Sequence, residues 1–231
     1  MPFLLSDKSM TPDKIFLPVV ETFSSIQGES THAGKLCFFI RLAGCNLKCS
    51  YCDTLYAQDK SCGAPRSLES LVGEAVKSGI STVEITGGEP ALHEAAPRLA
   101  EMLLAEGLEV LMETNGSVLL DKFPAQLKRI IDVKLPSSNM HTANLTENYS
   151  TLHAGDELKF VVGSRADFDY ALEWIDRWEL DKKGIPLIFS CVFGAVTPAG
   201  LVEWILASRR NNLRFQLQMH KFVWPPDARG V

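Results

Sequence analysis

The sequence predicts an α/β fold, an open, partial (β/α)6-type barrel with an incomplete helical layer. Short β-rich runs alternate with segments of helical spacing, which indicates a parallel sheet with right-handed crossovers. Six or seven such units are present, fewer than the eight of a closed barrel. Two connecting stretches are unlike helices, because 114–128 is short and 135–156 is rich in Ser, Asn, His and Thr.

The expected strands follow one another at regular intervals along the chain. Residues 1–14 mix polar and apolar types without a period and are expected to form a loose lead-in. The β-rich runs lie at 36–42, 81–86, 108–113, 129–134, 157–162, 185–192 and 213–218. Ligands of such folds gather at the carboxyl ends of the strands, so the residues just after each run are the candidates for function.

Four helices are expected between these runs, and their ends carry capping signals. Ser67 can cap a helix that ends before Gly79, and a second helix ends before Gly107. Thr197 and Pro198 suit the N-cap and the first position of the last helix. With their caps, the expected helices cover residues 67–77, 92–106, 165–179 and 197–210.

Length and charge limit the possible functions. A chain of 231 residues is expected to form a single domain, residues 1–231. The net charge of −5, with no Lys/Arg block, gives no electrostatic footprint for direct nucleic-acid binding, so a small-molecule substrate is expected. No apolar stretch approaches the roughly 20 residues of a membrane span, and no targeting segment is evident. The expected compartment is the cytoplasm.

Three closely spaced cysteines form the most informative motif. Cys45, Cys49 and Cys52 are separated by three and then two residues, directly after the run at 36–42. Three thiolates can hold a [4Fe–4S] cluster and leave one iron open to a small molecule. A structural zinc site would need a fourth ligand, and no second Cys or His pair has a suitable spacing. The other cysteines are expected to be two buried thiols and a loop thiol, Cys37, Cys191 and Cys62.

The C-x3-C-x2-C spacing resembles that of the radical S-adenosylmethionine (SAM) superfamily. This resemblance implies that SAM binds the open iron through its amino and carboxylate groups, with Tyr51 against the adenine. The segment 86–90, Thr-Gly-Gly-Glu-Pro, resembles the superfamily's GGEP motif, which implies SAM contacts for Gly87, Gly88 and Glu89. The methionine ammonium would be the partner of the acidic group. Without the cysteine motif, this segment could equally be a strand-to-helix turn.

Charged residues also follow two later strands. Glu113 lies at a strand end that is expected to face the same opening as the cysteines. Lys134 lies beside Asp132 in an otherwise apolar run, where an unpaired ammonium is costly to bury. Either it pairs internally or it meets an anionic ligand such as a carboxylate, and the residues alone leave both interpretations open.

A more specific resemblance extends from Glu21 to the C-terminus. The segment 21–29, E-T-F-S-S-I-Q-G-E, with the segment 39–44, Asp53-Thr54 and Gln-Met-His-Lys at 218–221, resembles the 7-carboxy-7-deazaguanine synthase family. These radical SAM carbon–nitrogen lyases of queuosine and 7-deazapurine biosynthesis convert 6-carboxy-5,6,7,8-tetrahydropterin into 7-carboxy-7-deazaguanine with loss of ammonia. The resemblance implies a [4Fe–4S] cluster, SAM used catalytically and Mg²⁺. It also implies a homodimer, with a flavodoxin or ferredoxin as the reductant.

The resemblance further implies roles for individual residues. Arg41 would hold the substrate carboxylate with two parallel N–H groups, and Thr54 would be a ligand of Mg²⁺. Together with the three cysteines, these two are the implied catalytic residues. The implied substrate contacts are Ile26, Gln27, Gly28, Arg41, Thr86, Glu113, His220 and Val231. The implied SAM contacts are Tyr51, Cys52, Asp53, Gly87, Gly88, Glu89, Asp132, Lys134 and Ser137. Residues 219–231 would be a tail over the active site, although His220 could also cap the last strand.

Three alternative functions remain open at the level of the sequence. One is a different radical SAM reaction, such as glycyl-radical activation of a partner protein, although the extra cysteine-rich inserts common in activases are missing. The second is a non-catalytic metal-binding protein, which iron and zinc content would distinguish. The third is a family member that binds pterin without converting it, which only an assay can identify.

Overall fold

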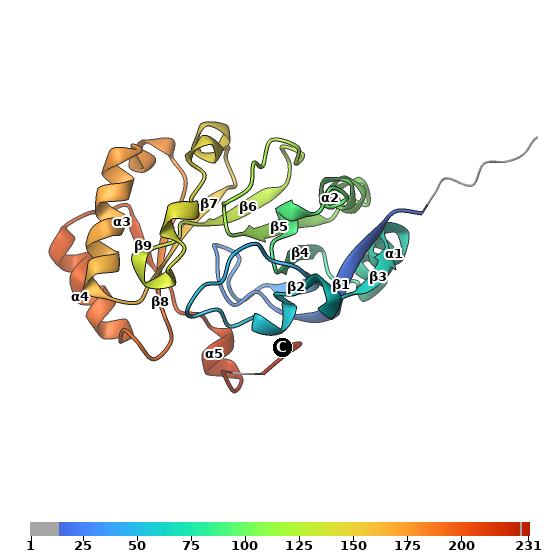
Figure 1. Cartoon of the computed structure of the whole chain (residues 1–231), viewed down its shortest axis with the longest axis horizontal. Coiled ribbons are helices and arrows are strands. Elements are labelled where there is room, and N and C mark those ends of the chain that lie inside the picture. The colour runs from blue at the N-terminus through green and yellow to red at the C-terminus, as the bar shows by residue number, and fades with distance from the viewer. Residues whose placement is uncertain (1–13, 227) are drawn as a thin grey trace, which may run out of the picture.

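Nine strands form one sheet in the computed structural model, which describes residues 14–226 and 228–231 (Figure 1). The strands are β1 (Phe16–Ile26), β2 (Leu36–Leu42), β3 (Ala64–Ser67), β4 (Thr82–Gly87), β5 (Glu109–Thr114), β6 (Lys128–Asp132), β7 (Glu157–Val162), β8 (Leu187–Cys191) and β9 (Leu213–Phe215). The predicted lead-in, residues 1–14, lies outside the described residues except for its last position.

The sheet is an open, partial barrel, as predicted. Its strand order is β3-β1-β2-β4-β5-β6-β7-β8-β9. From β2 onward each strand pairs in parallel with the next in this order, whereas β1 pairs antiparallel with β2 and β3. The order ends at β3 and β9, which do not pair with each other, so the barrel does not close.

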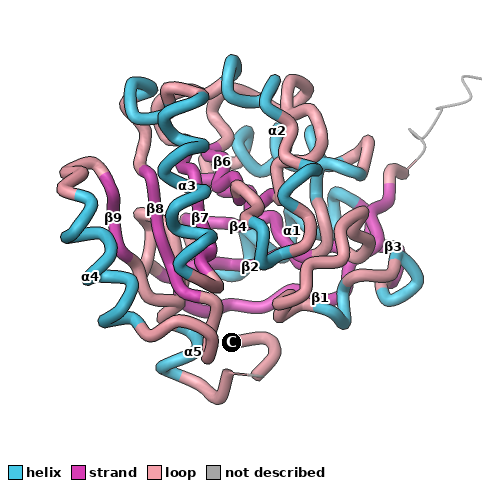
Figure 2. Tube along the Cα trace, turned by 60° about the vertical axis from the view of Figure 1, so that its left-hand side comes forward, coloured by secondary structure: helices cyan, strands magenta, loops and turns pink. Residues whose placement is uncertain are grey.

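Helices cover the outer face of this sheet (Figure 1). They are α1 (Leu68–Ser78), α2 (Ala96–Ala105), α3 (Arg165–Arg177) and α4 (Pro198–Ser208), whereas the short α5 (His220–Val223) lies on the open side of the sheet (Figure 2). Buried apolar side chains of α1 to α4 pack with those of the strands in one continuous core that includes Leu71, Leu103, Phe168 and Leu201. Because this core occupies the outer face of the sheet, the inner face is left for polar side chains.

The predicted capping signals are found at four helix ends. The hydroxyls of Ser67 and Thr197 accept hydrogen bonds from backbone N–H groups of α1 and α4, and Gly79 and Gly107 adopt left-handed conformations with φ of 70° and 77°. The predicted start of the second helix was wrong. The chain first forms a 3-10 turn, Pro90–Leu92, with Glu89 as its N-cap, and α2 begins only at Ala96.

The incomplete helical layer is also confirmed. Residues 115–127 contain no helix, and the connection from β6 to β7 contains only 3-10 turns: Pro136–Ser138, His141–Ala143 and Thr146–Thr151. None of the helices in the described part of the chain is both long and apolar enough to cross a membrane.

The sequence-based assignment missed β1, β3 and α5. β1 carries polar residues along much of its length, and β3 is a four-residue edge strand that contains Pro65. Proline is tolerated at a sheet edge because no neighbouring strand needs its N–H group. Figure 2 shows α5 and the C-terminus beside β1, where the chain returns to the open side of the sheet.

Candidate active site

Two adjoining cavities lie at the carboxyl ends of the parallel strands. Their volumes are about 340 Å³ and about 450 Å³, within the usual range for small-ligand sites. They share the wall residues Glu29, Arg41, Cys52, Asp53, Thr54, Thr86, Glu113, Lys221 and Pro226. Two ligands bound side by side would therefore meet across this common wall.

The residues expected to bind substrate and SAM divide between these cavities, apart from Arg41, Cys52, Asp53, Thr86 and Glu113, which lie on the common wall. Every expected substrate contact lines the smaller cavity: Ile26, Gln27, Gly28, Arg41, Thr86, Glu113, His220 and Val231. Most expected SAM contacts line the larger cavity: Tyr51, Cys52, Asp53, Gly87, Gly88, Asp132 and Lys134. Glu89 and Ser137 line neither cavity.

The three motif cysteines border the larger cavity on a loop held by backbone hydrogen bonds. Cys45 N donates to the Gln58 carbonyl at 2.9 Å, and Cys52 N donates to the Cys49 carbonyl at 3.2 Å. All three thiols are free and partly exposed, and the Asn115 amide donates to Cys45 Sγ at 3.7 Å. Burial raises the pKa of the Cys49 and Cys52 thiols, so a bound cation is needed to favour their thiolates.

This donor set fits a cluster better than a single ion. Among the described residues, no three His, Cys, Asp or Glu side chains are grouped so that they could hold one metal ion. In a [4Fe–4S] cluster each thiolate binds a different iron, so the three sulfurs need not converge on one point. Cys45, Cys49 and Cys52 are the residues that would hold such a cluster.

Gly87 and Gly88 bring the 86–90 turn against the cysteine loop. Gly88 N donates to the Leu42 carbonyl at 2.9 Å, and Glu89 N donates to the Gly44 carbonyl at 2.8 Å. A Cβ atom on Gly88 would lie 2.2 Å from the Gly44 carbonyl oxygen, and Gly87 has a φ of +119°. Both positions therefore require glycine.

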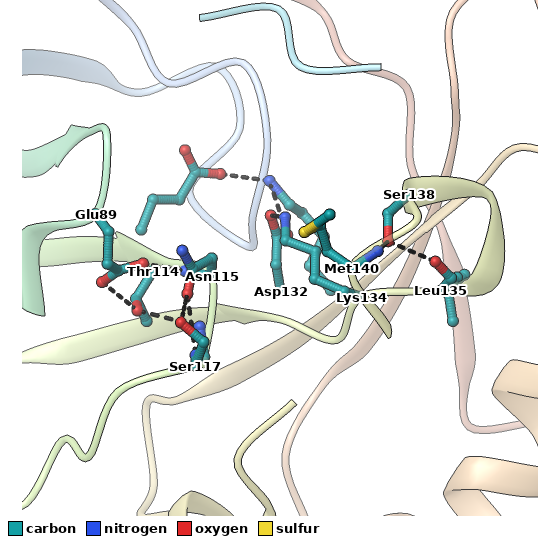
Figure 3. A network of polar contacts seen from close by, with 12 residues as sticks. Glu89, Thr114, Asn115, Ser117, Asp132, Lys134, Leu135, Ser138 and Met140 are labelled. Carbon is teal, nitrogen blue, oxygen red and sulfur yellow. Dashed lines mark hydrogen bonds and ion pairs between the residues drawn. The ribbon is translucent and has the colours of Figure 1, made fainter. Parts of the chain in front are cut away.

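Glu89 makes internal contacts that the motif did not predict. Its side chain is fully buried and accepts hydrogen bonds from Thr114 Oγ1 at 2.7 Å (Figure 3), from Asn115 N at 2.6 Å and from Ala91 N at 2.9 Å. Its contact with a SAM ammonium stays a prediction. The three hydrogen bonds fix the end of β5, including Asn115, which reaches the cysteine loop.

Lys134 and Asp132 form an ion pair, and a contact of Lys134 with an anionic ligand stays a prediction. Lys134 Nζ lies 2.7 Å from Asp132 Oδ2 (Figure 3), and both residues line the larger cavity. Burial would raise the pKa of Asp132, but the nearby lysines lower it. Ser137 lies outside both cavities, and its backbone N–H donates to Asp167 Oδ1 at 2.8 Å, so its contact with SAM stays a prediction.

Arg41 presents one edge of its guanidinium to the cavities. Its Nε donates to Glu21 Oε1 at 2.8 Å, and the Tyr56 hydroxyl donates to the same oxygen at 2.9 Å. The guanidinium carbon lies 5.5 Å from the Phe23 ring centroid and 5.8 Å from that of Tyr56. None of the described residues forms a hydrogen bond with its terminal nitrogens, so these are free to bind a ligand.

Asp53 and Thr54 lie on the wall shared by the two cavities. Thr54 Oγ1 donates to Asp53 Oδ1 at 3.0 Å, and Asp53 Oδ2 lies 2.8 Å from Lys221 Nζ. Burial alone would raise the pKa of Asp53, but Lys221 and the hydroxyl lower it to about 2. Since the Thr54 hydroxyl donates its proton to Asp53, its oxygen lone pairs remain free for a cation.

The segment after β1 and the C-terminal residues pack directly on each other. Gln27 donates its amide N–H to Glu84 and accepts a hydrogen bond from Glu29 N at 3.0 Å. A Cβ atom on Gly28 would lie 2.5 Å from His220 Nδ1, and Met219 N donates to the Gly28 carbonyl at 2.9 Å. Burial lowers the pKa of His220.

The C-terminal residues also form one wall of the smaller cavity. Arg229 lies 4.1 Å from the Tyr56 ring centroid, and Val231 lines the cavity beside Arg41. The remaining wall residues from this part of the chain are His220, Lys221, Pro225, Pro226, Ala228 and Gly230.

Lys159 and Glu84 belong to the site but were missed in the sequence. Lys159 Nζ forms ion pairs with Glu29 at 2.9 Å, with Asp132 at 3.4 Å and with Glu113. Glu84 is 1% exposed and lines the smaller cavity. Glu84 is the one charged residue of β4, and Lys159 precedes the apolar end of β7, so both resemble Lys134, which was singled out as a charge in an otherwise apolar run.

The comparisons with known proteins agree with this geometry. The family model of the radical SAM superfamily matches residues 39–204. The 7-carboxy-7-deazaguanine synthase of Clostridium acetobutylicum is 39% identical over 219 residues, which cover 92% of this chain and 98% of that protein. The synthase of Chlorobaculum tepidum is 40% identical over 219 residues, covering 93% and 97%. The crystal structure of QueE from Escherichia coli superposes with a TM-score of 0.72 at 25% identity, covering 89% of this chain and 95% of that one. The chain therefore belongs to the 7-carboxy-7-deazaguanine synthase family of the radical SAM superfamily.

Proposed function

We propose that this enzyme converts 6-carboxy-5,6,7,8-tetrahydropterin into 7-carboxy-7-deazaguanine and releases ammonia. The observation that carries the proposal is the separation of the two residue sets between adjoining cavities with a common wall. Family membership supports the same reaction class, and radical SAM enzymes use a [4Fe–4S] cluster and SAM. The product belongs to the pathway of queuosine and other 7-deazapurines.

The larger cavity is proposed to hold the cluster and SAM. When bound, this pair supplies a carbon-centred radical that can take hydrogen from a C–H bond. Cys45, Cys49 and Cys52 would hold the cluster. Tyr51, Asp53, Gly87, Gly88, Asp132 and Lys134 would surround SAM. Glu89 acts behind this wall, because its three hydrogen bonds keep the end of β5 in place.

The smaller cavity is proposed to hold the substrate. Arg41 binds the carboxylate with its free guanidinium edge, while Glu21 fixes its other side. The ring of the substrate would lie against Gln27 and Glu113, with Ile26, Gly28, Thr86, His220 and Val231 completing the pocket. Residues of the tail 219–231 close this cavity and exclude water, which favours a small molecule over a polypeptide as the substrate.

Magnesium is proposed to bind at Thr54, next to the substrate carboxylate. Mg²⁺ retains several waters and takes oxygen ligands from its substrates, so one neutral hydroxyl from the protein is sufficient. The ion would organise the carboxylate as a Lewis acid. We also propose a homodimer that works in the cytoplasm with a flavodoxin or ferredoxin as reductant, as the family resemblance implies.

An anaerobic assay tests the proposal. The reconstituted protein is incubated with reductant, SAM, Mg²⁺ and 6-carboxytetrahydropterin, and 7-carboxy-7-deazaguanine is followed by mass while SAM consumption is counted. Product in excess of the SAM lost is the expected result, because SAM is proposed to be regenerated in each cycle. Cleavage of SAM without any deazapurine would reject the substrate and leave the cluster assignment intact.

A further inference from the structure

Lys159 lies at the centre of a buried group of carboxylates on the inner face of the sheet. Its side chain extends from β7 and is 6% exposed. Its ammonium lies 2.9 Å from Glu29 Oε2 and 3.4 Å from Asp132 Oδ1, and it donates a hydrogen bond to Glu113 Oε1. A buried ammonium is costly unless it is paired, so these three contacts fix its position.

The carboxylates of Glu29 and Glu113 keep acceptor capacity in the walls of the cavities. Among the described residues, Glu29 Oε1 accepts a single hydrogen bond, from the Gln218 amide at 2.8 Å, while Glu29 Oε2 is buried and paired with Lys159. Glu113 Oε2 accepts only a long hydrogen bond from Thr86, at 3.3 Å. Both glutamates line the two cavities. Each carboxylate oxygen offers two lone pairs, so both groups can accept from a ligand N–H.

We propose that Lys159 is a positioning residue, which holds Glu29 and Glu113 as oriented acceptors for the N–H groups of a nitrogen-rich ring. This inference rests on the function proposed above, because a reduced pterin presents several N–H donors along its rings. A carboxylate that is ionised accepts hydrogen bonds only, whereas a protonated one also donates. For Glu29 and Glu113 to accept hydrogen bonds from the ligand N–H groups, Lys159 must therefore supply its positive charge as well as the bulk of its side chain.

The charge of Lys159 affects the pKa values of the surrounding carboxylates, so its removal can be measured. Burial raises the pKa of Glu84 and Glu113, and in both cases Lys159 opposes the rise. Removal of the ammonium would therefore raise the pKa of Glu113 further and leave more of it protonated near neutral pH. The titratable and charged groups that face Lys159 from the surrounding elements are Glu29, Arg41, Glu84, Glu113, Asp132, Lys134 and His220.

The test compares Lys159→Met with Lys159→Arg in the cluster-loaded enzyme. The pH profile of kcat/KM for the pterin substrate is measured anaerobically. For Lys159→Met we expect a loss of at least about tenfold at neutral pH and a shift of the acidic limb to higher pH by about one unit. Lys159→Arg keeps the charge, so its acidic limb should stay in place. The control is Lys128→Met, which removes the ion pair with Glu109 at the amino ends of β6 and β5.

A loss of activity without a shift of the acidic limb would show a structural role only and would overturn the inference. If Lys159→Met does not fold, Lys159→Met combined with Glu29→Gln and Glu113→Gln removes charge of both signs. This triple variant should be no more than about twofold worse than the variant that carries Glu29→Gln and Glu113→Gln alone, since the lysine acts through these two carboxylates. If the losses in kcat/KM caused by the lysine and glutamate changes multiply, the changes act independently and the inference is rejected.

Binding separates this inference from the proposed function. Titration of the loaded enzyme with 6-carboxypterin, an aromatic and unreactive analogue, is measured alongside turnover. If the wild type binds the analogue but forms no product, the proposed reaction fails, and the inference is then decided by binding. Affinity about tenfold weaker in Lys159→Met supports it, and equal affinity overturns it. If the wild type does not bind the analogue, both fail.

Discussion

Replacement of Arg41 tests how the enzyme recognises the carboxylate of its substrate. Glu21 and the rings of Phe23 and Tyr56 hold the guanidinium, so only its terminal N–H pair is free for a ligand. Lysine retains the charge but presents a single flexible ammonium in place of two parallel donors. We therefore expect Arg41→Lys to fold normally and to bind the pterin acid more weakly.

The expected size of this effect follows from the bonds that are lost. A hydrogen bond to a charged group contributes about 1.5–3 kcal/mol, and Arg41→Lys removes one of the two proposed bonds. This corresponds to a decrease of about 10- to 150-fold in kcat/KM. Arg41→Met removes both bonds and the charge, so a larger decrease is expected. The side chain is 16% exposed, and some screening by water places the expected value toward the lower end of this range.

A pair of ligands makes the result specific to the carboxylate. Calorimetric titration of the cluster-loaded enzyme with 6-carboxypterin, and with the same pterin lacking the carboxyl group, measures what that group contributes. The wild type should prefer the acid, and Arg41→Met should bind the two equally. The matched control is Arg66→Lys, which changes the ion pair with Glu74 at the edge strand β3 and should leave both affinities unchanged. Retention of the preference by Arg41→Met would refute this role of Arg41.

Three further changes test the cluster loop, the tail and the buried electrostatics. Cys49→Ala should abolish turnover and the visible absorbance of the reconstituted cluster. Gly28→Ala places a Cβ atom 2.5 Å from His220 Nδ1, so the tail should be displaced and pterin affinity should fall about tenfold, with SAM affinity unchanged in calorimetric titrations. Asp156→Asn breaks a fully buried pair in which Asp156 accepts from Arg129 Nε at 3.1 Å, and urea unfolding should show a loss of about 3–5 kcal/mol.

Matched controls in the same chain define the outcomes that would contradict these expectations. Cys62→Ala removes an exposed thiol and should keep the cluster. Gly73→Ala lies in α1 with nothing within 4 Å of the added Cβ, so its stability should stay the same or rise. Asp176→Asn breaks an exposed pair with Arg210 and should cost no more than about 1 kcal/mol. A variant that behaves like its control would show that the corresponding interaction was assigned wrongly.

Local signals account for the parts of the fold that were predicted correctly. The strand β2 (Leu36–Leu42) and the strand β7 (Glu157–Val162) have the predicted bounds, because runs that are buried on both faces of a parallel sheet are almost continuously apolar. β1 was missed for the opposite reason. It is antiparallel, and its polar residues include Glu21, which holds Arg41 in the site. Its residues are therefore suited to the function of the site as well as to burial, and the strand is not continuously apolar.

The candidate site was predictable where its residues form contiguous motifs. The cysteine loop, the 86–90 turn and the segment after β1 could each be identified from a few adjacent residues. The internal contacts of Glu89 were not predicted, because a motif gives residue types but not the direction of a side chain. Its three internal hydrogen bonds come from residues that are up to 26 positions away.

The direction of a strand side chain supplies the information that the motifs lack. Side chains alternate between the two faces of a strand, so Glu84 points to the same face as Thr86, two positions later. Asp132 and Lys159 are register partners on β6 and β7 and form an ion pair on that inner face. At the amino ends of β5 and β6, Glu109 and Lys128 instead form a partly exposed pair. A charged residue within a mostly apolar strand, with its side chain on the inner face of the sheet, is therefore a candidate for the site, as Glu84 and Lys159 show.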